Sequence, residues 1–198
     1  MKMISDDLAK LGYAIVPNFI SQNDLFSIVE EVNSLQASSL FKSAGVGRST
    51  EYQKDDQVRR DFIHWFDREA ETAVQKLITE PFELLRQECN QSLYLGLETF
   101  EGHYAIYEKG AFYKRHIDCF RNDDSRVLSA ILYLNLHWKK GDGGELILYT
   151  PEPLRVEPIG GTLVCFLSRD IEHEVLESAA RRLSFASWFR KRPVTLNV

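Results

Sequence analysis

The pattern of apolar and polar positions divides the chain into a helical first part and a β-rich second part. Residues 4–11 and 22–36 carry apolar side chains at helical spacing. Between them, residues 12–16 predict a short strand that ends at a Pro-Asn pair. The chain therefore opens with a helix, a strand and a second helix.

The middle of the chain begins with a long segment that has no regular pattern. Residues 38–57 combine two glycines with many polar side chains, and loops of this length in compact domains are often functional. Residues 58–66 return to strand character, and residues 68–90 predict a long amphipathic helix. Pro81 lies inside that helix and is expected to interrupt or restart it.

From residue 94 onward the pattern is typical of β-structure. Short segments rich in β-branched and aromatic residues alternate with Gly, Asp, Asn or Pro. These segments are residues 95–108, 112–118, 127–136, 145–150, 162–167 and 181–190. Helices followed by many strands predict an α+β, mainly β fold, with a double-stranded β-helix (a jelly roll, cupin-like) as its core and the N-terminal helices packed outside.

Length and composition fit a single globular domain over residues 1–198. With 44% hydrophobic and 27% charged residues, the chain is typical of a folded protein, and no apolar run reaches the length of a membrane span. We expect residues 1–90 to provide helical support and a long loop, and residues 91–198 to form the core. The net charge of −5 gives no general attraction to nucleic acid.

The cysteines and the amino terminus bear on the cellular compartment. Three cysteines without paired spacing fit a reducing environment better than a disulfide framework. The first residues carry acidic side chains and lack the apolar stretch of a signal peptide. We therefore expect a cytoplasmic protein.

A candidate metal site lies in the β-rich part. His116 and Asp118 share one face of a predicted strand, because residues i and i+2 point the same way. Alone, such a pair is usually an ordinary hydrogen-bonded contact, but His173 offers a third ligand further along the chain. Two histidines and one carboxylate are the ligands of non-haem Fe(II) oxygenases, although Mn, Co, Ni or Zn would also bind them.

The last predicted strand adds a buried positive charge. Arg182 shares a face with Ser184, Ala186 and Trp188, and a cation inside a β-barrel needs a partner. The planar guanidinium suits a carboxylate in bidentate geometry. The distal carboxylate of 2-oxoglutarate is the obvious candidate.

Several motifs together resemble a known enzyme family. They are HID at 116–118, EHEV at 172–175, RLSFASWF at 182–189, GGEL at 143–146 and YLN at 133–135. They resemble the Fe(II)- and 2-oxoglutarate-dependent prolyl 4-hydroxylases, most closely the oxygen-sensing prolyl hydroxylase domain type and its bacterial relatives. LAKLGYAIVPNFIS near the start and VRRDFIHWF at 58–66 extend the resemblance over most of the chain.

The resemblance implies a role for each matching residue. His116, Asp118 and His173 would bind iron. Arg182, Tyr133 and Trp188 would form the 2-oxoglutarate pocket, whereas Tyr107, Arg59, Asp61 and Trp65 would lie on the substrate side. It also implies O2 as co-substrate, ascorbate as a candidate reductant, succinate and CO2 as products, and a prolyl residue of a protein as the site of hydroxylation. Bacterial relatives are thought to act on cytosolic proteins such as translation elongation factors.

Other interpretations remain open from the sequence. The substrate could be a small molecule such as free proline or another amino acid, although the long 38–57 segment favours a polypeptide. A non-catalytic metal-binding or oxygen-responsive protein would not need Arg182. Arg59 and Asp61 could be a surface ion pair, Tyr133 could be plain core, and His64, His103 and His137 have no partners that would make them ligands.

Overall fold

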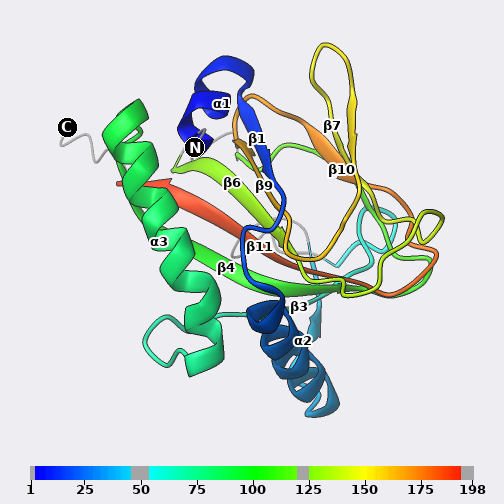
Figure 1. The fold of residues 1–198 in the computed structure, drawn as a ribbon. Helices are drawn as coiled ribbons and strands as arrows, with labels where there is room; N and C mark the ends of the chain where they lie inside the picture. Colours follow the sequence, from blue (N-terminus) through cyan, green and yellow to red (C-terminus); the bar gives the residue numbers. More distant parts are fainter. Residues whose placement is uncertain (1–2, 46–53, 120–124, 193–198) are drawn as a thin grey trace, which may run out of the picture.

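The computed structural model describes residues 3–45, 54–119 and 125–192 (Figure 1). In these ranges the helices are α1 (Ile4–Leu11), α2 (Gln22–Ala37) and α3 (Ala73–Leu93). The strands are β1 (Tyr13–Val16), β2 (Lys42–Ser43), β3 (Phe62–Trp65), β4 (Leu97–Tyr107), β5 (Tyr113–His116), β6 (Arg126–Tyr133), β7 (Leu146–Leu148), β8 (Leu154–Val156), β9 (Leu163–Leu167), β10 (His173–Val175) and β11 (Arg182–Lys191).

The strands form two antiparallel sheets. The larger has the order β1-β9-β6-β11-β4-β3-β2, and the smaller has the order β5-β10-β7-β8. Figure 1 shows α3 along one side of the larger sheet and the smaller sheet, with β7 and β10, on the other. The predicted mainly β fold with helices outside a jelly-roll core is confirmed, and the N-terminal part also contributes β1, β2 and β3 to the larger sheet.

Helix α3 covers the outer face of the larger sheet. It begins at Thr72, whose side chain accepts a hydrogen bond from the Gln75 N–H at 3.0 Å, a capping interaction that satisfies a free helix donor. The helix passes through Pro81 without a break, so the predicted interruption is wrong. The lost hydrogen bond of Pro81 is outweighed by burial of the face that carries Ile78 and Phe82.

The side chains of β11 alternate between the hydrophobic core under α3 and the space between the two sheets. Phe185 and Phe189 point toward α3, where their ring centroids lie 5.4 and 6.0 Å from that of Phe82. Arg182 and Ser184 point the other way, into the space between the sheets. The period of two in the strand thus places aromatic packing on one face and polar groups on the other.

The short strands were not expected from the sequence. Strands β2, β8 and β10 span only two or three residues each, which is too short for an alternating pattern to appear. The segment at 38–57 is irregular where it is described, apart from β2, and its residues 46–53 lie outside the described residues. Strand β10 matters most, because it begins at His173.

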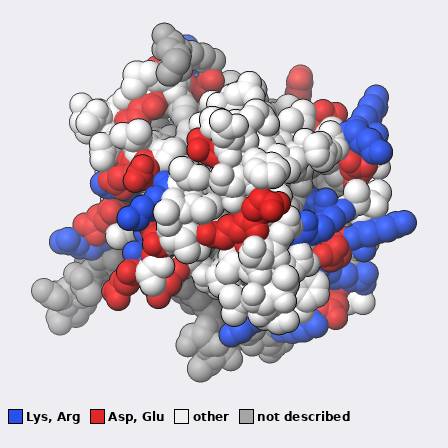
Figure 2. All heavy atoms as spheres, turned by 60° about the horizontal axis from the view of Figure 1, so that its bottom comes forward, with Lys and Arg blue, Asp and Glu red and all other residues white. Residues whose placement is uncertain are grey.

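Surface charge is mixed on the face shown in Figure 2. Asp and Glu side chains lie near its centre and among the Lys and Arg side chains toward its edges. This face therefore offers no broad positive surface of the kind that attracts a phosphate backbone. Within the described part of the chain, none of the helices is both long and apolar enough to cross a membrane.

Candidate active site

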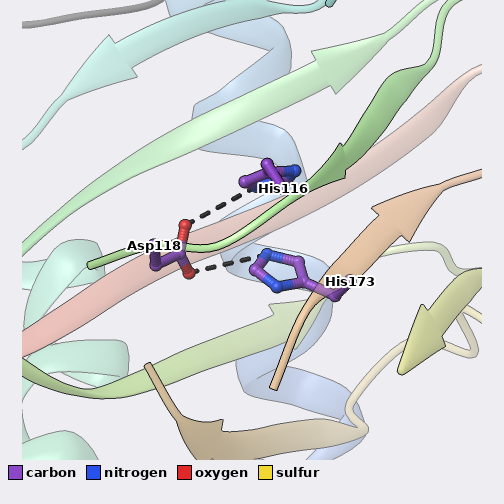
Figure 3. A group of neighbouring side chains, drawn as sticks. All are labelled: His116, Asp118 and His173. Atoms are coloured by element: carbon purple, nitrogen blue, oxygen red, sulfur yellow. Dashed lines mark ion pairs between the residues drawn. The ribbon is translucent and has the colours of Figure 1, made fainter. Parts of the chain in front are cut away.

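Three side chains meet at one end of the smaller sheet (Figure 3). His116 and His173 are direct partners across β5 and β10, and Asp118 lies in the bend that follows β5. Asp118 Oδ1 lies 3.6 Å from His116 Nε2, and Asp118 Oδ2 lies 3.5 Å from His173 Nε2. The structure thus brings together the three predicted metal ligands, with all three donor atoms within 4.8 Å of one another.

Backbone carbonyls set the orientation of both imidazoles. His116 Nδ1 lies 2.7 Å from the Lys114 carbonyl oxygen, and His173 Nδ1 lies 3.3 Å from that of Ile171. Because a carbonyl only accepts, each Nδ1 donates a hydrogen bond, and each Nε2 is the nitrogen that faces Asp118 and would face a metal. Burial lowers the pKa of His173 to about 4, against the opposing charge of Asp118, so its imidazole is neutral.

The carboxylate of Asp118 is held in place from β6. Ser129 Oγ donates to Asp118 Oδ2 at 2.7 Å and lies 2.9 Å from Ser168 Oγ, and all three side chains are buried. Burial alone would raise the pKa of Asp118, but His173, His116 and the Ser129 hydrogen bond hold it well below its usual value. Asp118 is therefore a charged ligand with a fixed orientation.

These three donors fit a divalent metal. Two imidazoles and one carboxylate match the facial triad of non-haem iron, with positions left open for other ligands. In residues 3–45, 54–119 and 125–192, it is the single group of three His, Cys, Asp or Glu side chains that could hold a metal.

A cavity of about 920 Å³ extends from the triad to Arg182. Arg182 is 2% exposed and donates to the Gly144 carbonyl at 2.8 Å and to Ser184 Oγ at 3.1 Å. None of the described carboxylates forms an ion pair with it. A Cβ at Gly144 would lie 2.7 Å from Arg182 Cδ, so the glycine makes room for the arginine.

Tyr133 adds a buried hydroxyl beside this arginine. Its ring centroid lies 5.2 Å from Arg182 Cζ, and its hydroxyl is fully buried. The Arg182 guanidinium has no acceptor atom, so it cannot receive the Tyr133 proton. No other described residue accepts a hydrogen bond from the Tyr133 O–H. Burial raises the pKa of Tyr133 to about 12, so the phenol keeps its proton. An anionic carboxylate would satisfy both groups, and the predicted 2-oxoglutarate fits this requirement.

Tyr107 and Trp188 also line the cavity, whereas the substrate-side role of Tyr107 and the 2-oxoglutarate role of Trp188 stay predictions. Tyr107 lies directly opposite Arg182 in the β4–β11 ladder, with Arg182 Cζ 4.7 Å from its ring centroid. Arg126 Cζ lies 3.9 Å from the ring centroid of Trp188. Both aromatic rings therefore have charged neighbours inside the cavity.

The predicted substrate-side residues differ in exposure. Trp65 is 45% exposed at the cavity, whereas the Asp61 side chain is fully buried. Arg59 binds both oxygens of Asp61, from Nε at 2.7 Å and from Nη2 at 2.5 Å. Burial opposes the charge of Arg59, but Asp61 raises the pKa of Arg59 above its ordinary value. The pair is not a surface ion pair, and its contact with substrate stays a prediction.

Several cavity residues were not assigned from the sequence, among them His103 and Tyr113. His103 packs against both Trp65 and Trp188, at centroid distances of 4.7 and 5.4 Å, and the two tryptophan rings lie 6.0 Å apart. His103 and Tyr107 are four residues apart on β4 and therefore share one face of the strand, a signal that could have placed His103 in the cavity. Tyr113 stacks on His116, and a regular strand would have put these two residues on opposite faces.

Comparison with known proteins identifies the family. Residues 102–190 match the family model of the 2OG-Fe(II) oxygenase superfamily. The chain is 37% identical to a Pseudomonas putida prolyl-4-hydroxylase of known crystal structure, with a TM-score of 0.86 and with 96% of this chain and 97% of that chain covered. The chain belongs to the 2OG-Fe(II) oxygenase superfamily. The predicted relationship to prolyl hydroxylases is confirmed.

Two further relatives of this oxygenase are prolyl hydroxylases linked to hypoxia-inducible factor. One, from Trichoplax adhaerens, was solved with a peptide of that factor; it is 27% identical, with a TM-score of 0.86, and the match covers 96% of this chain and 88% of that one. The other is the hypoxia-inducible factor prolyl hydroxylase of Caenorhabditis elegans, 28% identical over 199 residues. The match covers 92% of this chain but only 27% of the C. elegans protein.

Membership of the superfamily establishes the cofactors. The enzyme is a dioxygenase that uses Fe(II), 2-oxoglutarate and O2. The triad, Arg182 and Tyr133 have the chemistry that these groups require.

Proposed function

We propose that this oxygenase hydroxylates a prolyl residue within a protein substrate, with 2-oxoglutarate converted to succinate and CO2. The observation that carries the proposal is the rim of the cavity. Leu40, Trp65 and Ile117 line the cavity and are 48%, 45% and 42% exposed. Large apolar side chains exposed around an open site are typical of contact with another macromolecule.

The chain's own residues divide the work inside the cavity. When bound, iron and 2-oxoglutarate supply the oxidising chemistry that places an oxygen atom from O2 on a substrate carbon. His116, Asp118 and His173 would hold the metal, and Arg182 with Tyr133 would bind and orient the distal carboxylate. The protein thus fixes the reacting groups relative to one another, which is its main contribution in cofactor enzymes.

An aromatic wall is suited to the target ring. Trp65, His103 and Trp188 lie next to one another on the side of the cavity formed by β3, β4 and β11. Burial and the charge of Arg59 lower the pKa of His103 to about 4, so this wall carries no imidazolium at neutral pH. The faces of aromatic rings accommodate the apolar C–H groups of a prolyl ring.

We further propose a folded cytosolic protein, such as a translation elongation factor, as the substrate. The support is the resemblance of the motifs to bacterial members of the family. Cytoplasmic location and ascorbate as reductant belong to the same proposal. The buried cysteines Cys89 and Cys165 form no disulfide among the described residues, which agrees with a reducing compartment.

The test compares a protein substrate with a small molecule. The purified enzyme with Fe(II), 2-oxoglutarate and ascorbate is incubated with a bacterial translation elongation factor or with free proline. We expect succinate release and the mass gain of one oxygen atom on a prolyl residue of the protein, both absent with Arg182→Ala. Turnover of free proline without modification of any protein would instead establish the small-molecule alternative.

A further inference from the structure

A β-bulge brings Tyr113 and His116 to the same side of β5. Between the pairs His173↔His116 and Val175↔Tyr113, β10 advances two residues while β5 advances three. The extra residue rotates the strand locally, as bulges beside active sites often do. The two rings stack, with centroids 3.6 Å apart and 15° between their planes.

Arg59 covers the opposite face of the Tyr113 ring. Its Cζ lies 4.2 Å from the ring centroid, and the stacked imidazole of His116 already occupies the other face. The backbone supports this contact, because Arg59 and Tyr113 form an antiparallel bridge and the Lys114 N–H donates to the Val58 carbonyl at 2.9 Å. The phenol ring is therefore held between a cation and a metal ligand.

Asp61 fixes the plane of the guanidinium. The two hydrogen bonds from Arg59 use both carboxylate oxygens, and the side chains of Arg59 and Asp61 are 11% and 0% exposed. A bidentate pair has a defined geometry, and burial removes the competition of water. The orientation of the whole stack thus follows from a buried ion pair.

We propose that Tyr113 is a positioning residue for His116, held in place by Arg59 and Asp61. The flat contact with Tyr113 restricts rotation of the imidazole, while the hydrogen bond from Nδ1 to the Lys114 carbonyl determines that Nε2 faces the metal. Groups that orient a ligand in this way contribute to metal affinity. This role requires no contact between Arg59 or Asp61 and a substrate.

Binding of Co(II) alone to the metal-free enzyme tests this proposal. The visible spectrum of Co(II) reports coordination geometry, and titration gives its Kd. Tyr113→Leu removes the stacked ring, and we expect a Kd raised roughly 10-fold together with a changed spectrum. Tyr113→Phe keeps the ring and should match the wild type.

Arg60→Met is the matched control. Arg60 lies over Phe112, with Cζ 4.9 Å from the ring centroid, in the same pair of segments but without contact to His116. It should leave the Co(II) Kd and spectrum unchanged. A folded Tyr113→Leu variant with wild-type Kd and spectrum overturns the proposal.

A second variant keeps the test decisive if Tyr113→Leu does not fold. The double variant Arg59→Gln with Asp61→Asn removes both charges together and leaves no buried ion without a partner. A severalfold weaker Co(II) affinity supports the proposal, and an unchanged affinity and spectrum overturn it. Because Co(II) is the probe, this result is independent of which residue the enzyme hydroxylates.

Discussion

His116 and His173 are direct partners in an antiparallel ladder, with ring centroids 4.2 Å apart. Strands β5 and β10 thus bring together two ligands that are distant in the sequence, and the bend after β5 adds Asp118 between them. Sheet pairing, rather than a flexible loop, defines the distance between the imidazoles. A site built on paired strands is ready for a metal before the metal binds.

Tyr133→Phe should weaken 2-oxoglutarate binding with little effect on the fold. The lost hydroxyl is a donor to a charged carboxylate, so we expect a Kd raised roughly 10-fold. The free energy of unfolding without ligand should stay within about 1 kcal/mol of wild type, because the buried O–H has no acceptor among the residues that the structure describes. Tyr104→Phe is the control, since the Tyr104 hydroxyl contacts Glu31 outside the cavity. Equal 2-oxoglutarate affinity in wild type and Tyr133→Phe would remove Tyr133 from the pocket.

Ser129→Ala should weaken metal binding. Without the Ser129 hydrogen bond, Asp118 is no longer fixed toward the metal, and we expect the Kd for Mn(II), measured by magnetic resonance, to rise roughly 10-fold. Ser187→Ala is the matched control on β11, because Ser187 Oγ is buried without a partner among the described residues. If both variants bind Mn(II) like the wild type, the Ser129 contact has no role in the site.

The sequence was sufficient to predict that His116, Asp118 and His173 come together and that Arg182 lies on the inward face of its strand. The first prediction depends on chemistry, because two histidines and a carboxylate are ligands that iron prefers. The second depends on local alternation, because every second residue of a strand points to the same face. Such features need no knowledge of how distant segments pair. His103 and Tyr107 follow the same alternation. His103 was not assigned to the cavity because the sequence shows no second ligand that would pair with it in a metal site.

Other features depend on contacts that no local pattern reveals. The bulge that places Tyr113 beside His116 is a one-residue change of register, which only the pairing of β5 with β10 defines. Similarly, the apolar Leu84 is 67% exposed although it lies next to Leu85 in the sequence, because the face of α3 that is buried carries Phe82 and Leu85. The continuous helix through Pro81 has the same cause, since tertiary packing overrides local preference.

Phe82→Ala and Leu84→Ala should separate the two faces of α3. Phe82 is fully buried against three other aromatic rings of the sheet, so its loss should lower the free energy of unfolding by about 3–5 kcal/mol. Leu84→Ala should change it by less than about 0.5 kcal/mol. Urea unfolding monitored by circular dichroism measures both, and a large loss for Leu84→Ala would contradict this orientation of the helix.

His103 should make the protein sensitive to acid. Its pKa falls from 6.5 to about 4 on folding, through burial first and the charge of Arg59 second. Between pH 6.5 and pH 4 the unfolded chain therefore binds more protons at His103 than the folded protein does. The free energy of unfolding is unaffected by His103 above pH 6.5 and decreases as the pH falls toward 4. The loss amounts to about 3 kcal/mol at most.

Replacement of His103 should flatten this acid dependence. Urea unfolding at pH 7.5 and at lower pH compares wild type with His103→Gln, and the exposed His137→Gln serves as the control. We expect a smaller loss of stability on acidification for His103→Gln than for either of the other proteins. Parallel curves for all three would show that His103 does not titrate on unfolding.

The central claim is that one cavity binds Fe(II) through the triad and 2-oxoglutarate through Arg182. Its most direct test is an anaerobic titration of the metal-free enzyme with Fe(II) and then 2-oxoglutarate, following the visible charge-transfer band of the chelated complex. We expect the band in wild type, normal Fe(II) binding by Arg182→Ala, and at least a roughly 10-fold higher 2-oxoglutarate concentration for half-saturation in that variant. No band in folded, iron-loaded wild type would contradict the account, as would equal saturation curves for wild type and Arg182→Ala.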